Sequence, residues 1–143
     1  MTANNPFQSD SAAARGGGHR ITVEPSNRRV SVTFAGQTIA DSQRALILRE
    51  AGLPPVFYFP PDDVRTDLLA PTNRHTRCPF KGEASYWSIR TTERMSENAV
   101  WSYLDPLPER TDIKGYLAFY PDRVQITEAD AAVARPEGTL LSE

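Results

Sequence analysis

The stretch "RITVEPSNRRVSVTF", residues 20–34, contains two short runs in which apolar and polar side chains alternate. In the second run Val30, Val32 and Phe34 occupy every other position, so they share one face of an extended chain. β-Branched residues at this spacing are typical of strands, and "PSN" between the two runs suits a connection. The stretch therefore predicts two consecutive β-strands with a common buried face.

The two-residue period recurs along most of the chain. Ala35-Gly36-Gln37 turns the second strand into "TIADS", and Pro121-Asp122 predicts a hairpin between the last two runs, because proline and aspartate suit turn positions. Many short strands without an alternating helix predict a mainly β domain with one or two short helices. The further strand candidates are "FYF" (57–59), "EASYWSIR" (83–90), "AVWSYL" (99–104), "YLAFY" (116–120) and "RVQIT" (123–127).

Two segments are candidates for helices. Asp41 or Ser42 is placed to cap "QRALILREA", and Gly52 is placed to end it, although a strand explains residues 42–51 nearly as well. "PPDDVRTDLL" begins with proline and acidic residues, as a short helix does.

Length and composition indicate one soluble domain. The 143 residues suffice for one packed core, residues 19–128 carry the strand pattern, and we expect a disordered tail over 1–18 and an extension over 129–143. The net charge of −2 gives no field that would attract nucleic acid or an acidic membrane. No apolar run approaches the roughly 18 residues of a membrane span. The single cysteine and the absence of a signal peptide predict a cytoplasmic location.

Several motifs, in this order, resemble those of a bacterial family of domains of unknown function, family 427. They are "VTFAGQTIADSQRALILREAGLPPVFYFPPDDV" (32–64), "CPFKGEASYWSI" (78–89), "AVWSYLDPLPE" (99–109) and "IKGYLAFYPDRV" (113–124). The resemblance implies a β-tent fold of two antiparallel sheets, a shape also seen in methionine sulfoxide reductase B and in the ligand-binding domain of cereblon. It implies no reaction, although the family also carries the label of a nucleotidyltransferase domain.

The chain departs from what related activities require. Many β-tent proteins hold zinc with two Cys-x-x-Cys pairs, but here Cys78 is the only cysteine, and His19 and His75 stand far apart, so we expect no metal and no cofactor. A nucleotidyltransferase needs paired carboxylates for two magnesium ions, yet no Gly-Ser motif followed by Asp-x-Asp occurs. Asp62 and Asp63 instead open a predicted helix.

The stretch "HTRCPFKGEASYW", residues 75–87, gathers most of the reactive side chains. Cys78 lies near Arg77, Lys81 and His75, which would lower the pKa of a nucleophilic thiol, but a small buried cysteine fits the same pattern. Lys81 is a candidate for holding an anionic or carbonyl group, with a solvated turn lysine as the alternative. If this is a catalytic site, Cys78 and Lys81 are its candidate residues.

The aromatic residues favour a binding function instead. We expect Tyr58, Trp87, Trp101 and Tyr103 to form the walls of a pocket for a small molecule or a modified side chain. Its polar contacts would be Arg65, Lys81 and Asp105. In this hypothesis residues 75–87 form one wall of the pocket, Lys81 and Trp87 face it, and Cys78 is structural. An enzyme and a protein-interaction scaffold are the alternatives, and the chain acts as a monomer or a homodimer.

Overall fold

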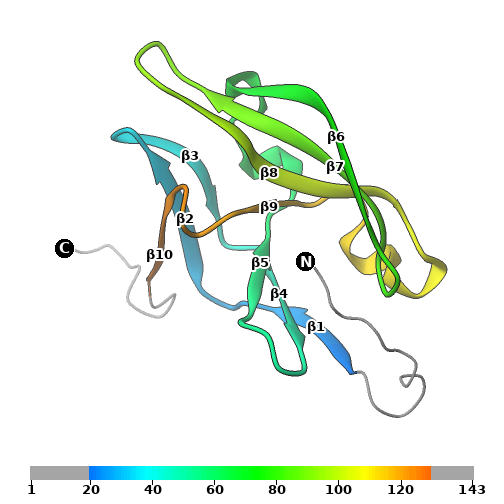
Figure 1. Ribbon diagram of the computed structural model, residues 1–143. Coiled ribbons are helices and arrows are strands. Elements are labelled where there is room, and N and C mark those ends of the chain that lie inside the picture. The colour runs from blue at the N-terminus through cyan, green and yellow to red at the C-terminus, as the bar shows by residue number, and fades with distance from the viewer. Residues whose placement is uncertain (1–19, 130–143) are drawn as a thin grey trace.

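The computed structural model describes residues 20–129, which form ten β-strands and three short 3-10 helices (Figure 1). The N-terminal tail and the C-terminal extension therefore lie outside the described residues, except for Ala129, which ends the last strand. None of the helices described is long and apolar enough to span a membrane. The strands are β1 (Ile21–Pro25), β2 (Arg29–Phe34), β3 (Gln37–Ser42), β4 (Leu46–Glu50), β5 (Val56–Tyr58), β6 (Leu69–Cys78), β7 (Gly82–Arg90), β8 (Met95–Pro106), β9 (Leu117–Phe119) and β10 (Gln125–Ala129), and the helices are η2 (Pro61–Asp63), η3 (Thr66–Leu68) and η4 (Pro108–Ile113).

The strands pair antiparallel, which confirms the predicted mainly β class. They form three sheets in the part of the chain described, with strand orders β1-β4-β5, β10-β2-β3 and β6-β7-β8-β9, rather than the two that were expected. The difference is small, because an isolated antiparallel bridge between Phe59 and Leu117 joins the first sheet to the third. Its two backbone hydrogen bonds are both 2.8 Å long. We call the resulting joined sheet the curled sheet.

Side chains on the two strands at this joint alternate between two separate cores. Phe57 and Phe59 pack into one core and Tyr58 packs into the other. On β9, Leu117 and Phe119 join the first core, while Ala118 joins the second. Because neighbouring residues of a strand point to opposite faces, the two cores lie on opposite faces of the curled sheet.

The first core, which we call the hydrocarbon cluster, lies between the curled sheet and the sheet β10-β2-β3. Its alternating residues on β2 are those that the sequence predicted to share a face, and Val30 and Val32 are fully buried. Burying each such side chain contributes roughly 1.5–3 kcal/mol. The cluster comprises Val30, Val32, Phe34, Ile39, Ala40, Ala45, Phe59, Val64, Ile89, Ala99, Val100, Leu117 and Phe119.

The second core, which we call the tyrosine cluster, fills the inside of the curled sheet. Leu48 and Tyr58 come from the three-stranded part, and Tyr86 and Tyr103 come from the four-stranded part. Their contact means that the two parts fold over and face each other. The cluster comprises Leu48, Tyr58, Ala84, Tyr86, Tyr103, Ile113 and Ala118, with the partly buried Ile21, Val23, Leu46, Val56, Cys78, Trp101, Tyr116 and Tyr120 packed against it.

The turn predicted after β2 is confirmed. Ala35 and Gly36 both have positive φ values, 53° and 77°, which is the signature of a two-residue type I′ hairpin turn. This turn pairs β2 directly with β3.

Of the two helix candidates, one contains a strand, the alternative left open for residues 42–51, and the other forms two short 3-10 helices. Residues 46–50 are strand β4, which pairs with β1 and β5, because the period of two lets Leu46 and Leu48 face the tyrosine cluster together. The segment that begins at Pro61 contains two single 3-10 turns, with Val64 between them buried in the hydrocarbon cluster. Tertiary burial therefore favours a strand at residues 46–50 and interrupts the second helical segment at Val64.

The predicted hairpin over residues 116–127 is also wrong. A turn does form at Pro121-Asp122, where Arg123 N donates to Tyr120 O at 2.9 Å, but the flanking strands separate. β9 pairs with β8 and β10 pairs with β2, in different sheets. Residues 69–78, which were not among the strand candidates, form the edge strand β6.

Candidate functional site

All five tyrosines of the chain belong to the tyrosine cluster or pack against it. In contrast, four phenylalanines belong to the hydrocarbon cluster or pack against it. The tyrosines therefore gather on the inner face of the curled sheet, and most phenylalanines lie in the hydrocarbon cluster on its other face. This inner face is the candidate functional site.

The rings of this site are connected by short polar contacts. Trp101 Nε1 donates a hydrogen bond to Tyr58 Oη at 3.3 Å, and the two rings meet edge to face with their centroids 6.3 Å apart. Trp101 also packs against Tyr120, with a centroid distance of 4.6 Å. Tyr86 Oη lies 3.3 Å from Tyr120 Oη and 2.8 Å from Thr76 Oγ1. The half-buried Trp101 and Tyr120 thus connect the buried rings to solvent.

A cation lies over one of these rings. The Arg74 guanidinium carbon is 5.0 Å from the Tyr86 ring centroid, within the range of a cation–π interaction. Arg74 is exposed, and its strand β6 brings Thr76 and Cys78 to the same face at alternate positions. β6 therefore contributes one side of the site.

Burial keeps the phenols of this site neutral. Desolvation raises the pKa of Tyr58, Tyr103 and Tyr120 above the ordinary value of 10. At neutral pH each hydroxyl therefore retains its proton and can donate it in a hydrogen bond. Within residues 20–129 the Tyr103 hydroxyl makes no hydrogen bond, although Tyr103 is only 6% exposed.

One end of the tyrosine cluster carries a buried ion pair. Lys81 Nζ, in the turn between β6 and β7, lies 2.8 Å from Glu50 Oε1 at the end of β4. Their side chains are only 10% and 9% exposed. Burying two charges is costly, and their mutual attraction offsets that cost only while both are present. The pair ties the three-stranded part of the curled sheet to the four-stranded part.

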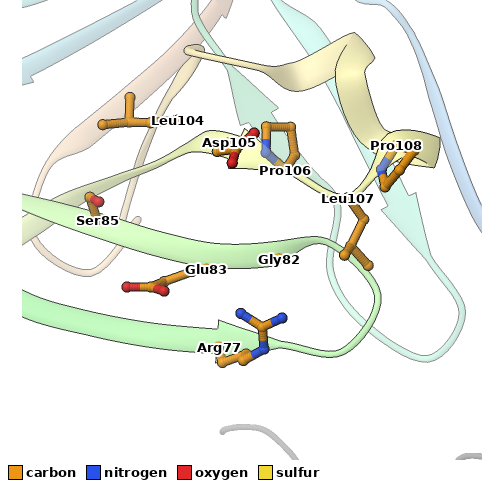
Figure 2. A pocket seen from close by; sticks show the side chains of 9 residues that line it. All are labelled: Arg77, Gly82, Glu83, Ser85, Leu104, Asp105, Pro106, Leu107 and Pro108. Carbon is orange, nitrogen blue, oxygen red and sulfur yellow. The ribbon is translucent and has the colours of Figure 1, made fainter.

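A second feature is a depression on the outer face of the four-stranded sheet, about 510 Å³ in volume (Figure 2). Gly82, with a φ of 117°, allows the chain at Pro106 and Leu107 to pass close by, since a Cβ at this position would meet backbone atoms of both at 3.2 Å. No aromatic residue is among those that line the depression. The lining residues are Arg77, Gly82, Glu83, Ser85, Leu104, Asp105, Pro106, Leu107 and Pro108.

Comparison with known proteins agrees with this fold. Residues 22–130 match the model of the domain of unknown function numbered 427. The chain belongs to this family. No individual curated protein matches the chain.

The family 427 domain brings four of the seven predicted ligand-binding residues together. Tyr58, Trp101 and Tyr103 meet in the tyrosine cluster, and Lys81 joins them through Glu50, whose charge acts on both Tyr58 and Tyr103. These four residues therefore lie near one another, and the lysine is buried in an ion pair.

The other three predicted residues lie elsewhere. Arg65 is exposed and pairs with Asp67 at 2.8 Å. Trp87 packs against the hydrocarbon cluster, and Asp105 lines the outer depression. Four members of residues 75–87 line that depression, namely Arg77, Gly82, Glu83 and Ser85, whereas Lys81 and Trp87 do not.

Cys78 is the last residue of β6 and is partly buried against the tyrosine cluster. His75 faces the other side of the strand, where its Nδ1 lies 3.3 Å from Glu83 Oε2. The family 427 domain therefore does not present His75 to Cys78 as a base. Among the residues described, no group of three His, Cys, Asp or Glu side chains could hold a metal ion.

Sequence reasoning missed Glu50, and it did not place Arg74 over a tyrosine ring. Glu50 could have been found by reading residues 46–50 as a strand, because Leu46, Leu48 and Glu50 then share one face. No comparable signal marks Arg74, whose position depends on how β6 pairs with β7.

Proposed function

We propose that the domain is a binding module for a small, uncharged, planar molecule, or for a modified side chain of that chemistry, held at the tyrosine cluster. The observation that carries the proposal is the gathering of all five tyrosines at one core, in which the Tyr103 hydroxyl makes no hydrogen bond within residues 20–129. The Tyr103 side chain is largely buried, and polar groups in such surroundings normally have a hydrogen-bond partner, so a ligand oxygen would complete the site.

The electrostatics support an uncharged ligand. The phenols are neutral donors, and Lys81 and Glu50 compensate each other, so neither of these two buried charges is available to a charged ligand. The rings of Trp101 and Tyr120 pack against each other and are only half-buried, so a flat ligand could pack beside them. A planar carbonyl compound, such as an imide, combines the required acceptor with a flat surface.

Binding accounts for the site better than catalysis by the thiol. A cysteine nucleophile needs a base or a cation that stabilises the thiolate, and His75 lies on the opposite face of β6. The nucleotidyltransferase label lacks support as well, since among residues 20–129 no group of three or more His, Cys, Asp or Glu side chains could hold a metal ion.

We also propose a cytoplasmic setting, because the single cysteine cannot form an intramolecular disulfide and suits a reducing compartment. The net charge of −2 disfavours nucleic acid as a partner. We further propose that the chain acts as a monomer or a homodimer and that its partner is a small molecule.

A thermal-shift and calorimetric screen tests the proposal. Succinimide and uracil serve as uncharged planar probes, and succinate serves as a charged probe of similar size to succinimide. We expect the uncharged probes to raise the melting temperature of the wild type and to do so less in Tyr103→Phe, which removes only the hydroxyl.

Trp87→Phe is the matched control, because this ring packs against the hydrocarbon cluster on the other face. Its affinity for the probes should equal that of the wild type. Preference for succinate, or equal loss of affinity in both variants, would argue against the tyrosine cluster as the binding site.

A further inference from the structure

The outer depression has features that the tyrosine cluster does not explain. It lies where β6, β7 and β8 end near the start of η4, and residues of all three strands line it. Its volume of about 510 Å³ falls within the range of small-molecule sites. In Figure 2, Ser85 and Leu104 lie at one end, and Leu107 and Pro108 lie at the other. Most of this lining comes from paired strands, so its shape is fixed.

A β-bulge builds one side of the depression. Glu83 pairs with Asp105, but Ser85 pairs with Ser102, so β8 has one residue more than β7 over this interval. A bulge of this kind redirects side chains and often occurs beside functional sites. Tyr103 remains buried in the tyrosine cluster, whereas the two residues that follow it are both exposed.

The bulge therefore places an apolar and an acidic side chain next to each other on the outer surface. Leu104 is 50% exposed. Together with Pro106 and Leu107 it gives the depression an apolar surface beside the Asp105 carboxylate.

The charges of the depression are incompletely compensated. Arg77, Glu83 and Asp105 stand opposite one another on three adjacent strands, so two carboxylates are direct cross-strand neighbours. Like charges in such positions destabilise a sheet. Glu83 has His75 at 3.3 Å, but within residues 20–129 Asp105 has no ion-pair partner. A cation between the two carboxylates would offset their repulsion, since Arg77 balances only one of them.

We propose that this depression binds a small organic primary amine with an apolar body. Its ammonium group lies between Glu83 and Asp105 and donates hydrogen bonds to both carboxylates. The apolar body covers Leu104 and Leu107, which removes their exposed surface from water. The site is separate from the tyrosine cluster, which lies on the opposite face of the same strands.

Nuclear magnetic resonance titration of the ¹⁵N-labelled full chain tests this proposal. The probe is 2-phenylethylamine, and its uncharged counterpart is 2-phenylethanol. We expect saturable shifts of the backbone amides of Glu83, Ser85, Leu104, Asp105 and Leu107 with the amine, and an affinity for the alcohol that is weaker by about tenfold.

Asp105→Asn keeps the shape of the side chain and removes its charge, and Asp122→Asn, at an exposed turn outside the depression, is the control. We expect the first to weaken amine binding by about tenfold and the second to leave it unchanged. Equal binding of amine and alcohol, equal effects of the two substitutions, or the absence of saturable shifts at these amides would overturn the proposal. Shifts confined to amides of the tyrosine cluster would also overturn it, without affecting the proposed function of that cluster.

Discussion

Replacing Lys81 by methionine removes one half of the buried ion pair that ties β4 to the turn between β6 and β7. The two charged groups are 2.8 Å apart, and their side chains are 10% and 9% exposed. Methionine has nearly the same length as lysine, so packing is retained while the charge that compensates the buried Glu50 carboxylate is lost. Removing one partner of a buried pair costs about 3–5 kcal/mol. Since domains are stable by only about 5–15 kcal/mol, this is a large fraction of the total.

Replacing both residues by methionine should recover most of that loss. Without either charge there is no buried carboxylate to compensate, and apolar side chains of similar volume often substitute for an ion pair at little cost. We expect Glu50→Met/Lys81→Met to unfold within about 1 kcal/mol of the wild type, so that the two substitutions are strongly coupled.

Urea unfolding followed by far-ultraviolet circular dichroism measures these differences. The chain supplies its own control, because its only other lysine, Lys114, is exposed, and Lys114→Met should change the unfolding free energy by less than about 0.5 kcal/mol. If Lys81→Met costs no more than Lys114→Met, or if the double variant loses the sum of the single losses, the ion pair does not hold the curled sheet together.

Three further predictions concern single groups. Tyr58→Phe removes the acceptor of the Trp101 Nε1 hydrogen bond and should lower the unfolding free energy in urea by about 1 kcal/mol; no change would mean that water replaces the hydroxyl. Cys78 is partly buried, so Ellman's reagent should label it about tenfold more slowly than a free thiol, and Cys78→Ser should retain probe binding; fast labelling with loss of function confined to this variant would favour a thiol enzyme. Hydrogen bonds from Arg44 lower the pKa of Asp63 below its ordinary 3.8, so this carboxylate stabilises the fold above that pH and loses its effect as the pH falls through the lowered value. Asp63→Asn should therefore flatten the acid side of the melting-temperature profile, and an unchanged profile would refute this.

The sequence predicts the strands better than their partners. Alternation identifies β2 because Val30 and Val32 must share a buried face, and a type I′ turn can be read from neighbouring residues. Pairing is decided by contacts between distant segments. β9 leaves β10 because Leu117 forms the bridge to Phe59 and both residues fill the hydrocarbon cluster.

The residues of the candidate site could likewise be predicted from the sequence, whereas their arrangement could not. The aromatic residues and Lys81 stand out in the sequence by type and rarity, and most of them do converge. Which face of the curled sheet each aromatic residue occupies depends on the bridge between Phe59 and Leu117. No local sequence pattern predicts this bridge. The exposure of Asp105 depends on a bulge in β8 that is set by the register with β7.

Titration calorimetry of succinimide and uracil with wild-type and Tyr103→Phe protein tests the tyrosine cluster most directly. The Tyr103 hydroxyl makes no hydrogen bond within the described chain, so its removal should leave the unfolding free energy unchanged or slightly higher. We predict saturable binding of at least one uncharged probe to the wild type and an affinity for Tyr103→Phe that is weaker by about tenfold. Equal affinities in the two proteins, or no saturable binding of either probe, would contradict a ligand site at the tyrosine cluster.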